Sequence, residues 1–477
     1  MSEPLLFINA RLVDCDTDTS GALLVRDGKI AAVYHDVNAA QAETPAMSFQ
    51  PAKLKSSVPD GSPAHAKSFH PAGVGHPAQV ATPDGSLHPA QAEHPEARVI
   101  DCGGATLMPA FVDMHAHFRD PGFTHKEDLK SGSRAAAAGG FATVVLMPNT
   151  NPVISDRAAS LAVRARASGA EFPDIFQSVS LTRGFGGTDT STLVDLDPSE
   201  TPIATEDGHE VASAAVMLDA MRICAKTGVL VCCHCEDPSL AERARELRTA
   251  ALADPGNSAA LYTKAERLLR LAEDTLTYRN LALAEEAGCR VHIDHLSTTG
   301  SLAAVRDAKQ RRSGVSCEVM PHHLALTAES PEIVNPPLRH EEDRMALIRG
   351  LVDGTIDAIA TDHAPHTAED KQAGAPGFSG IQAAFPVCNT VLVKAGHLSL
   401  SALSRLMSAN PARLLGLDRG RLSEGLDADL VLLDPEKTVT IDPSSESWYS
   451  RGKNCPYAGK AYRGEILATF RRGQRIF

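Results

Sequence analysis

Residues 109–129 read PAFVDMHAHFRDPGFTHKEDL, and the interpretation of most of the chain starts from this stretch. Its first residues are mostly apolar, as is typical of a buried strand, and the strand ends in two histidines, His115 and His117. Residues two apart on a strand share a face about 6.6 Å apart along the backbone, a span that two imidazoles can close onto one metal ion. A single pair of this kind is a weak signal, so its meaning depends on the rest of the chain.

The same strand-like pattern recurs seven more times. The further apolar runs lie at 142–147, 175–180, 202–205, 229–234, 290–295, 315–320 and 356–362. Helical stretches such as 161–167 and 266–287 separate them. Apolar strands that alternate with helices indicate a parallel sheet covered on both faces. Eight such units predict an α/β fold, a (β/α)8 TIM-type barrel over 109–412, with the active site at the carboxyl ends of its strands.

The two ends of the chain follow a different pattern. Strand-like runs at 5–13, 22–26, 29–33 and 98–101 precede the barrel, with Asp27-Gly28 as a hairpin turn, and runs at 429–433 and 465–470 follow it. We therefore predict one small β-sandwich domain built from both termini, with 1–34 and 98–108 as its first part and 413–477 as its second.

A segment at 35–97 interrupts the first part. It is rich in Pro, Ala and His, with an imperfect His-Pro-Ala repeat at 70–72, 76–78 and 88–90, and it has neither helical nor strand periodicity. Frequent prolines remove hydrogen-bond donors, so we predict a mobile surface insertion. Metal storage is the alternative for its histidines, which are His65, His70, His76, His88 and His94.

Composition excludes several classes of protein. The chain has 477 residues, 43% of them hydrophobic, which is enough for a large core. A formal charge of −13 argues against nucleic-acid binding, and the lack of an apolar run of about 18 residues argues against a membrane span. Ten scattered cysteines suggest reduced thiols and a cytoplasmic enzyme with a small-molecule substrate. The cluster Cys-Cys-His-Cys at 232–235 is interpreted as packing, with a metal role as the alternative, and no GxSxG motif supports a serine hydrolase.

Polar residues follow the predicted strands at the positions where a barrel enzyme needs them. His234 ends the fifth strand, His295 the sixth and Asp362 the eighth, while Asp207 follows the fourth. Together with His115 and His117 they would be costly to bury unless a cation compensated them. The sequence therefore predicts a metal centre of six ligands at one end of the barrel.

The pattern resembles the amidohydrolase superfamily, and more closely the class I dihydroorotases. The resemblance covers nearly the whole chain except 35–97. Besides 109–129, its most specific stretches are AAAAGGFATVVLMPNTNPV (135–153), ATEDG (204–208), CHCED (233–237), DHLST (294–298), PHHL (321–324), NPPLR (335–339), GTIDAIATDHAPH (354–366) and ANPARLLGL (409–417). The sequence departs from the family at Ala110, where glycine is usual, and at Glu206, where an aspartate is frequent.

The resemblance implies two zinc ions per subunit. His115, His117 and Asp362 would hold one ion, and His234 and His295 the other, with Asp207 as the bridge. The implied substrate contacts come from His117 and Arg119, which would pair with a carboxylate, and from Asn149, Asn335, His366 and the backbone near Pro376 and Gly377. Asp362 is the candidate catalytic residue, which takes a proton from water and delivers it to the departing amide nitrogen.

The implied activity is reversible hydrolysis of (S)-dihydroorotate to N-carbamoyl-L-aspartate in de novo pyrimidine synthesis, with ring closure favoured in acid. One alternative is another cyclic-amide hydrolase, such as a hydantoinase. Those relatives bridge their metals with a carboxylated lysine, and this chain has no lysine between Lys130 and Lys226. The other alternative is a silent homologue that scaffolds aspartate carbamoyltransferase, which is also the partner that the resemblance suggests, together with a homodimer. His322 and His323 are left open between a supporting and a structural role.

Overall fold

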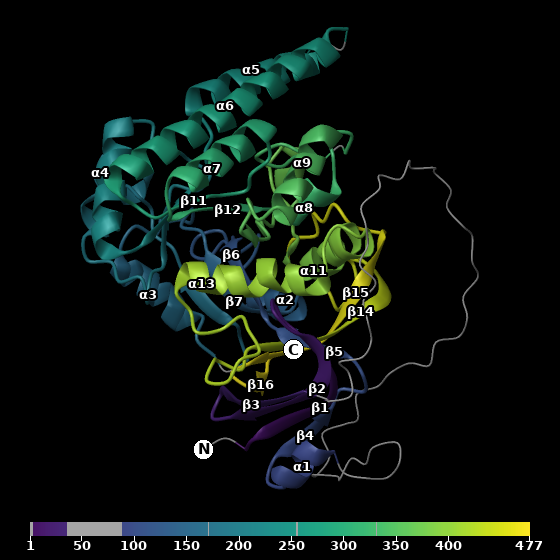
Figure 1. Ribbon diagram of the computed structural model, residues 1–477. Coiled ribbons are helices and arrows are strands. Elements are labelled where there is room, and N and C mark those ends of the chain that lie inside the picture. Colours follow the sequence, from purple (N-terminus) through teal and green to yellow (C-terminus); the bar gives the residue numbers. More distant parts are fainter. Residues whose placement is uncertain (1–2, 36–87, 170, 254–255, 331) are drawn as a thin grey trace.

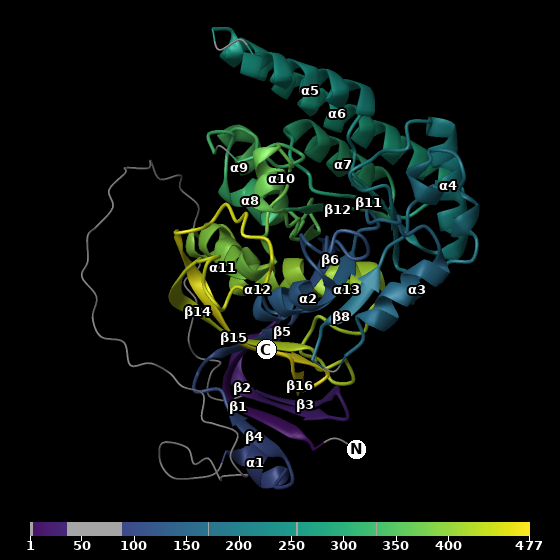
Figure 2. The ribbon, with the colours of Figure 1, turned by 180° about the vertical axis from the view of Figure 1, so that it is seen from behind.

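The computed structural model describes residues 3–35, 88–169, 171–253, 256–330 and 332–477. A barrel forms the centre of the molecule, and a sheet made from both chain ends lies at one end of it (Figure 1). Seen from behind, helices cover the outside of the barrel, and the terminal sheet stays at the same end (Figure 2).

Eight short parallel strands form the barrel, as predicted. They are β6 (Phe111–Ala116), β7 (Phe141–Leu146), β8 (Asp174–Gln177), β9 (Ile203–Thr205), β10 (Leu230–Cys233), β11 (Val291–Ile293), β12 (Val315–Val319) and β13 (Ala358–Ile359). They pair in the orders β6-β7-β8 and β9-β10-β11-β12-β13. Single parallel bridges, Val179 with Ala204 and Ala116 with His363, join the two sets, so the ring closes. Every residue of these strands is buried except Asp174, in keeping with a sheet covered on both faces.

The helices around the barrel begin and end where the sequence provides caps. They are α2 (Leu129–Ala138), α3 (Arg157–Arg166), α4 (Ala214–Thr227), α5 (Pro238–Ala253), α6 (Ser258–Ala287), α7 (Thr299–Arg311), α8 (Pro321–Ala325), α9 (Glu341–Val352), α10 (Ala368–Gln372), α11 (Ala384–Cys388), α12 (Leu400–Ser404) and α13 (Asn410–Leu415). Asp128 caps α2 through the Ser131 backbone amide, and Asp156 caps α3 in the same way. Gly228 ends α4 in the left-handed conformation that favours glycine.

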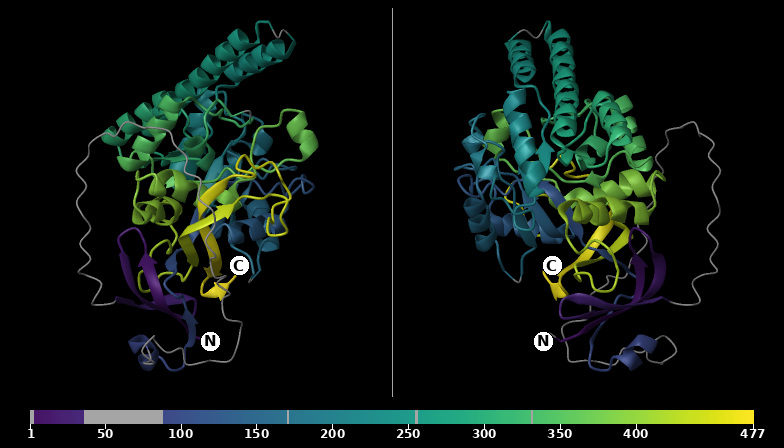
Figure 3. Two further views of the ribbon diagram at one scale, coloured as in Figure 1. Left: turned by 90° about the vertical axis from the view of Figure 1, so that its right-hand side faces the viewer. Right: turned by 60° about the vertical axis from the view of Figure 1, so that its left-hand side comes forward.

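Helices α5 and α6 form a long hairpin that projects from the barrel at the end farthest from the terminal sheet (Figure 3). Helix α5 follows β10 after a short loop, so the hairpin starts at the carboxyl ends of the barrel strands. Across the described residues, no helix is both long and apolar enough to span a membrane.

The terminal sheet uses strands from both chain ends, as predicted. Its strands are β1 (Leu5–Val13), β2 (Asp18–Arg26), β3 (Lys29–His35), β4 (Arg98–Asp101), β5 (Thr106–Pro109), β14 (Leu430–Thr440), β15 (Ala461–Arg471) and β16 (Gln474–Arg475). They form one hydrogen-bonded sheet in the order β16-β15-β14-β5-β1-β2-β3, with β4 also paired to β1. The sheet curls over an apolar core, so that the rings of Phe7 and Phe470 lie 5.1 Å apart although two strands separate β1 from β15. Asp27 and Gly28 make the predicted turn, both with positive φ.

The end of the predicted insertion is structured. Residues 89–93 form helix α1 (Pro89–Glu93), whose first turn is capped by the buried His88 side chain. Ala90 and Ala97 are buried against β1 and β2, because small apolar side chains fit the outer face of that sheet. His94 contacts the Tyr34 hydroxyl through Nε2 at 2.7 Å. Residues 88–97 of the predicted insertion thus belong to the described structure, while His65, His70 and His76 lie outside the described residues.

Candidate metal centre

The six predicted ligands meet at one point. Asp207 lies at the centre, with its Oδ1 3.3 Å from His115 Nε2, 3.5 Å from His234 Nδ1 and 3.9 Å from His295 Nε2. Its Oδ2 is 3.5 Å from His117 Nε2. Asp362 Oδ1 lies 3.1 Å from His117 Nε2 and 3.8 Å from His115 Nε2. Two imidazoles contact each other directly, because His234 Nδ1 is 2.8 Å from His295 Nε2.

Each of these side chains comes from the carboxyl end of a different barrel strand, apart from His115 and His117, which lie at the end of β6 and directly after it. Asp207, His234, His295 and Asp362 follow β9, β10, β11 and β13. The backbone at His295 and Asp362 has φ of 32° and 45°, a left-handed conformation that is strained for residues other than glycine. Such strain costs about 1–3 kcal/mol per residue and persists where the surroundings hold a side chain in a required direction.

The centre is buried, and its charges depend on one another. Burial by itself opposes ionisation of Asp207, but His115, His234 and His295 outweigh it and hold the pKa of Asp207 well below its usual range. Burial likewise opposes protonation of His115, yet Asp207 and Glu318 raise the pKa of His115 well above normal. In the same way, contacts with His117 and His115 override burial and lower the pKa of Asp362. The two carboxylates therefore stay ionised inside the protein.

The donor set fits a divalent metal ion. His115, Asp207 and His295 have ligand atoms within 4.8 Å of one another, and so do His115, His117 and Asp362. Nitrogen and carboxylate oxygen donors suit zinc and similar ions. His115 Nε2 is buried and makes no hydrogen bond in the part of the chain that the structure describes, although Asp207 Oδ1 lies 3.3 Å away, so this nitrogen is available to a cation that replaces its proton.

The predicted substrate residues surround the same point. Asn149 connects two of the predicted ligands. Its Oδ1 lies 2.9 Å from His117 Nδ1, and its Nδ2 donates to Asp207 Oδ2 at 2.9 Å. Arg119 Nη2 lies 3.3 Å from His366 Nε2, and Asn335 Nδ2 donates to Glu236 at 2.9 Å and lies 3.4 Å from His234 Nε2.

Comparisons with known proteins agree with this geometry. The model of the "Amidohydrolase family" matches residues 106–476. The chain belongs to this family. It is 40% identical to the dihydroorotase of Clostridium botulinum (strain Eklund 17B / Type B) over 79% of this chain and 88% of that protein. It is 38% identical to the dihydroorotase of Listeria innocua over 79% and 88%. Among solved structures, the L-hydantoinase (dihydropyrimidinase) from Arthrobacter aurescens aligns with a TM-score of 0.78 and 25% identity, over 99% of this chain and 95% of that one.

The loop at Pro376 and Gly377 borders the substrate residues of this amidohydrolase. Gly377 has φ of 129°, and a Cβ there would lie 2.7 Å from the Ala364 Cβ, so only glycine fits. The Gly377 amide donates to the Ile333 carbonyl, and its own carbonyl accepts from Lys371 and Asn454. Both backbone groups are thus already bonded within the protein, and a substrate contact there stays a prediction.

Sequence reasoning missed the residues on the far side of His115. Its Nδ1 lies 3.1 Å from Glu318 Oε1, and His292 Nε2 lies 3.3 Å from the other oxygen of Glu318. Asp294 completes a group with His115 and Glu318 whose ligand atoms lie within 4.8 Å of one another. A charged residue in the apolar run 315–320 was the available signal, since a buried strand rarely carries an unpaired carboxylate.

The two departures from the family pattern leave the six ligands in place. Glu206 accepts hydrogen bonds from the Thr182 amide at 2.7 Å and from its hydroxyl, and it belongs to none of the candidate metal groups of the described residues. Burial raises the pKa of Glu206 to about 7. Ala110 is buried, and its amide donates to the Asp429 carbonyl, which joins the barrel to the terminal sheet.

The cysteines of the cluster at 232–235 and the pair His322 and His323 pack against other parts of the protein. The thiols of Cys232, Cys233 and Cys235 are buried in the apolar core, and all ten cysteines of the chain are free. His323 Nε2 lies 3.1 Å from the Pro336 carbonyl, and the His322 ring packs 5.2 Å from that of Phe378.

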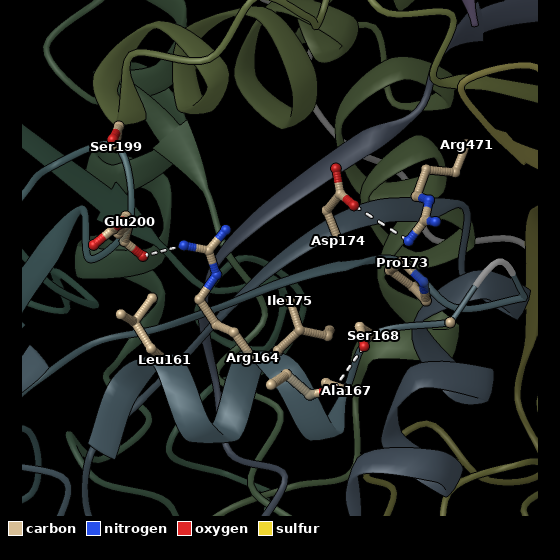
Figure 4. A pocket seen from close by; sticks show the side chains of 12 residues that line it. Leu161, Arg164, Ala167, Ser168, Pro173, Asp174, Ile175, Ser199, Glu200 and Arg471 are labelled. Carbon is tan, nitrogen blue, oxygen red and sulfur yellow. Dashed lines mark hydrogen bonds and ion pairs between the residues drawn. The ribbon is translucent and has the colours of Figure 1, made fainter. Parts of the chain in front are cut away.

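A surface hollow of about 530 Å³ lies at α3 and β8, away from the metal centre (Figure 4). None of the predicted site residues lines it. Arg164 donates to the Glu200 backbone carbonyl there, and Arg471 pairs with Asp174 at 3.2 Å, so its charged groups are bonded within the protein.

Proposed function

We propose that this amidohydrolase is a dihydroorotase, which interconverts (S)-dihydroorotate and N-carbamoyl-L-aspartate in de novo pyrimidine synthesis. The observation that carries the proposal is Arg119 beside six metal-type ligands. No carboxylate among the described residues lies within ion-pair distance of its guanidinium. The relatives named dihydroorotase, at 38–40% identity over 79% of this chain, support the same substrate.

Arg119 is proposed to bind the ring carboxylate of the substrate. Its Nε donates to the Pro365 carbonyl at 3.4 Å and its Nη2 lies 3.3 Å from His366 Nε2, which together orient the planar guanidinium. Burial and the nearby Arg119 charge lower the pKa of His366 to about 4, so this imidazole is neutral at pH 7 and accepts from Arg119. The remaining N–H groups of the fork suit a two-point contact with a carboxylate.

Two zinc ions are proposed for the centre, with His115, His117 and Asp362 around one, His234 and His295 around the other, and Asp207 between them. Such ions would supply a Lewis acid for the ring carbonyl and would lower the pKa of water from about 15.7 toward about 7. Asn149 orients the centre from outside, because it contacts both His117 and Asp207.

Asp362 is proposed to carry the proton. Its Oδ1 contacts His117, which leaves Oδ2 to accept a proton from the attacking water and to deliver it to the ring amide nitrogen as the C–N bond breaks. The contacts with His117 and His115 lower the pKa of Asp362, so the carboxylate is ionised at neutral pH before the water attacks. Ring closure uses the same group in reverse and takes up one proton.

Ring opening by the purified protein tests the proposal. L-dihydroorotate is compared with dihydrouracil and hydantoin, which lack the carboxylate, and zinc content is measured on the same samples. We expect turnover of dihydroorotate at a kcat/KM at least 100-fold above that of either analogue. Preference for an uncharged ring would instead favour a hydantoinase-like enzyme, which the similarity to the L-hydantoinase structure keeps as the second candidate. Absence of both metal and turnover would favour a silent scaffold.

The cellular setting is also a proposal. Ten free, buried thiols fit a reducing compartment such as the cytoplasm. Light scattering on the purified protein tests the homodimer that the family resemblance implies, and co-purification tests the association with aspartate carbamoyltransferase.

A further inference from the structure

The chain between β14 and β15 belongs by sequence to the terminal sheet, but its middle part lies against the barrel. In Figure 2 this connection, in yellow, runs from the two strands toward α10. Residues 450–454 of the connection contact two segments that carry proposed substrate residues, 119–128 after β6 and 363–379 after β13. Two substrate segments that are far apart in the sequence are therefore joined by a third.

Asn454 is hydrogen-bonded to several points of the segment 363–379. Its Oδ1 accepts from the His366 amide at 3.2 Å and from the Ser379 hydroxyl at 2.8 Å. Its Nδ2 donates to the Gly377 carbonyl at 3.0 Å, and its own carbonyl accepts from the Ser379 amide at 3.0 Å. Because a side-chain amide offers both a donor and an acceptor, Asn454 holds the beginning and the end of this segment together.

Gly452 brings the same connection into direct contact with Pro365. A Cβ at Gly452 would lie 2.6 Å from the Pro365 Cβ and 2.2 Å from the Ser379 Oγ, so the close approach depends on glycine. The Trp448 side chain is buried, and its Nε1 donates to the Gly452 carbonyl at 3.0 Å. The buried indole therefore keeps the connection next to Pro365.

The connection also holds the other substrate segment, through the fully buried Glu127. The Glu127 carboxylate accepts from the Ser450 hydroxyl and from the Arg451 amide, the latter at 3.3 Å. It also lies 3.3 Å from His363 Nε2, which carries the ring proton because His363 Nδ1 accepts from the Gly380 amide at 3.2 Å. One carboxylate thus joins both substrate segments to the connection between β14 and β15.

The two substrate segments meet at the guanidinium of Arg119. Its Nε donates to the Pro365 carbonyl at 3.4 Å, and its Nη2 lies 3.3 Å from His366 Nε2. Both contacts come from residues that Gly452 and Asn454 hold in place. A two-point contact with a carboxylate depends on the direction of the guanidinium plane, and a misplacement of about 1 Å can cost about 100-fold in rate.

We propose that Asn454 is a positioning residue for the carboxylate pocket. It holds residues 363–379 in the arrangement in which the Pro365 carbonyl and the His366 ring orient Arg119 toward the substrate. Asn454 acts through Arg119 and not through a contact of its own with the substrate. The inference rests on the proposed function and deepens it, because it makes the affinity for a carboxylated ring depend on a segment outside the barrel.

Steady-state kinetics of Asn454→Leu test the inference on the full-length, zinc-loaded protein. Leucine has nearly the shape of asparagine but makes none of its side-chain hydrogen bonds. We expect KM for dihydroorotate to rise about 10-fold while kcat stays within a factor of about two, because binding is weakened and the metal centre is untouched. An unchanged KM, or a loss confined to kcat, would overturn the inference.

Asn389→Leu is the matched control. Asn389 is buried, and its Nδ2 donates to the Pro435 and Arg463 carbonyls at 2.8 Å each, on the terminal sheet. This variant should lower the free energy of unfolding and leave KM unchanged. A rise in KM as large as that of Asn454→Leu would assign the effect to general destabilisation and would count against the inference.

A double variant tests whether Asn454 acts through Arg119. Once Arg119→Lys has removed the two-point contact, adding Asn454→Leu should change KM by less than about twofold, because both substitutions remove the same interaction. If the two effects on KM multiply, Asn454 acts independently of Arg119 and the inference is wrong.

Hydrogen–deuterium exchange followed by mass spectrometry gives a readout that does not need activity. We expect amides of the segment 363–379 to exchange about 10-fold faster in Asn454→Leu and at the native rate in Asn389→Leu. Unchanged exchange in Asn454→Leu would overturn the inference. Faster exchange in a protein whose native form does not open dihydroorotate would refute the proposed function and still support the positioning of this segment.

Ser379→Ala replaces Asn454→Leu should that variant not fold. It removes one donor to Asn454 Oδ1 and leaves the other hydrogen bonds of the asparagine in place. Exchange of the same segment should be faster than in the native protein, and equal exchange with an equal KM would overturn the inference.

Discussion

The metal centre and the junction between the barrel and the terminal sheet both bury charged side chains, but they compensate the charges differently. At the junction, Arg419 lies 2.8 Å from Asp174, 2.9 Å from Asp427 and 2.9 Å from Asp429. At the centre, carboxylates meet imidazoles instead, as where Asp207 Oδ1 lies 3.3 Å from His115 Nε2.

The difference follows from the chemistry of the two cations. A guanidinium is always charged and presents five donors in a plane, so one arginine neutralises and orients several carboxylates by itself. An imidazole loses its proton near neutral pH and then offers a lone pair, which attracts a metal ion. Buried carboxylates that are balanced by an arginine therefore indicate stability, and buried carboxylates that are balanced by imidazoles, which can exchange their protons for a metal ion, indicate a site.

The largest expected effect is at the centre. Asp362→Asn should lower kcat/KM for dihydroorotate by about 10³- to 10⁴-fold, because it removes the proposed proton carrier and weakens a ligand. Steady-state kinetics measure the loss, and circular dichroism should show an unchanged fold. Glu369→Gln, an exposed change on α10, is the control. Near-native activity of Asp362→Asn would refute the assignment.

Breaking the junction should affect stability instead of chemistry. Arg419→Met leaves Asp429 with no cation in ion-pair range among the described residues, and such a loss costs about 3–5 kcal/mol. Urea denaturation measures the change in the free energy of unfolding. The kcat of the folded protein should stay within a factor of about two. A large fall in kcat with an unchanged free energy of unfolding would contradict the view that the junction serves stability and the metal centre serves catalysis.

Arg119→Lys is expected to act on substrate binding. An ammonium cannot reproduce the two-point contact of the guanidinium, so KM for dihydroorotate should rise about 10- to 100-fold, with a smaller change in kcat. Arg183→Lys, at an exposed pair with Asp189, is the control. Equal KM values in the native protein and Arg119→Lys would mean that the carboxylate binds elsewhere.

The smallest effect is expected at an exposed ion pair of the terminal sheet. Arg11 and Asp18 lie 2.7 Å apart, but their side chains are 42% and 41% exposed. Arg11→Ala should therefore cost less than about 1 kcal/mol of unfolding free energy, as measured in the same urea experiment. A loss as large as that of Arg419→Met would show that burial does not separate the two classes of pair.

Much of the fold could be predicted because its signals are local. Eight apolar runs predicted the eight barrel strands, and Asp27-Gly28 predicted the hairpin between β2 and β3, since both patterns are properties of neighbouring residues. Boundaries were less accurate. The run at 356–362 yields only Ala358–Ile359 as strand, because the chain turns toward the metal centre before Asp362.

The six ligands could be located because each ends or follows a strand, and strand ends of a barrel share one rim. Their roles came from the family resemblance and remain predictions. Asp294, His292 and Glu318 could not be connected with His115 in this way, since their contact depends on which side chains point across the barrel.

From the order of its residues alone, this chain specified a closed parallel barrel with terminal strands beside it, because hydrophobic periodicity is set by nearest neighbours along the chain. Tertiary structure alone decided which polar atoms remain without partners. That outcome depends on distances between segments as far apart as 203 residues, as between His115 and Glu318, and such distances exist only once the barrel has closed.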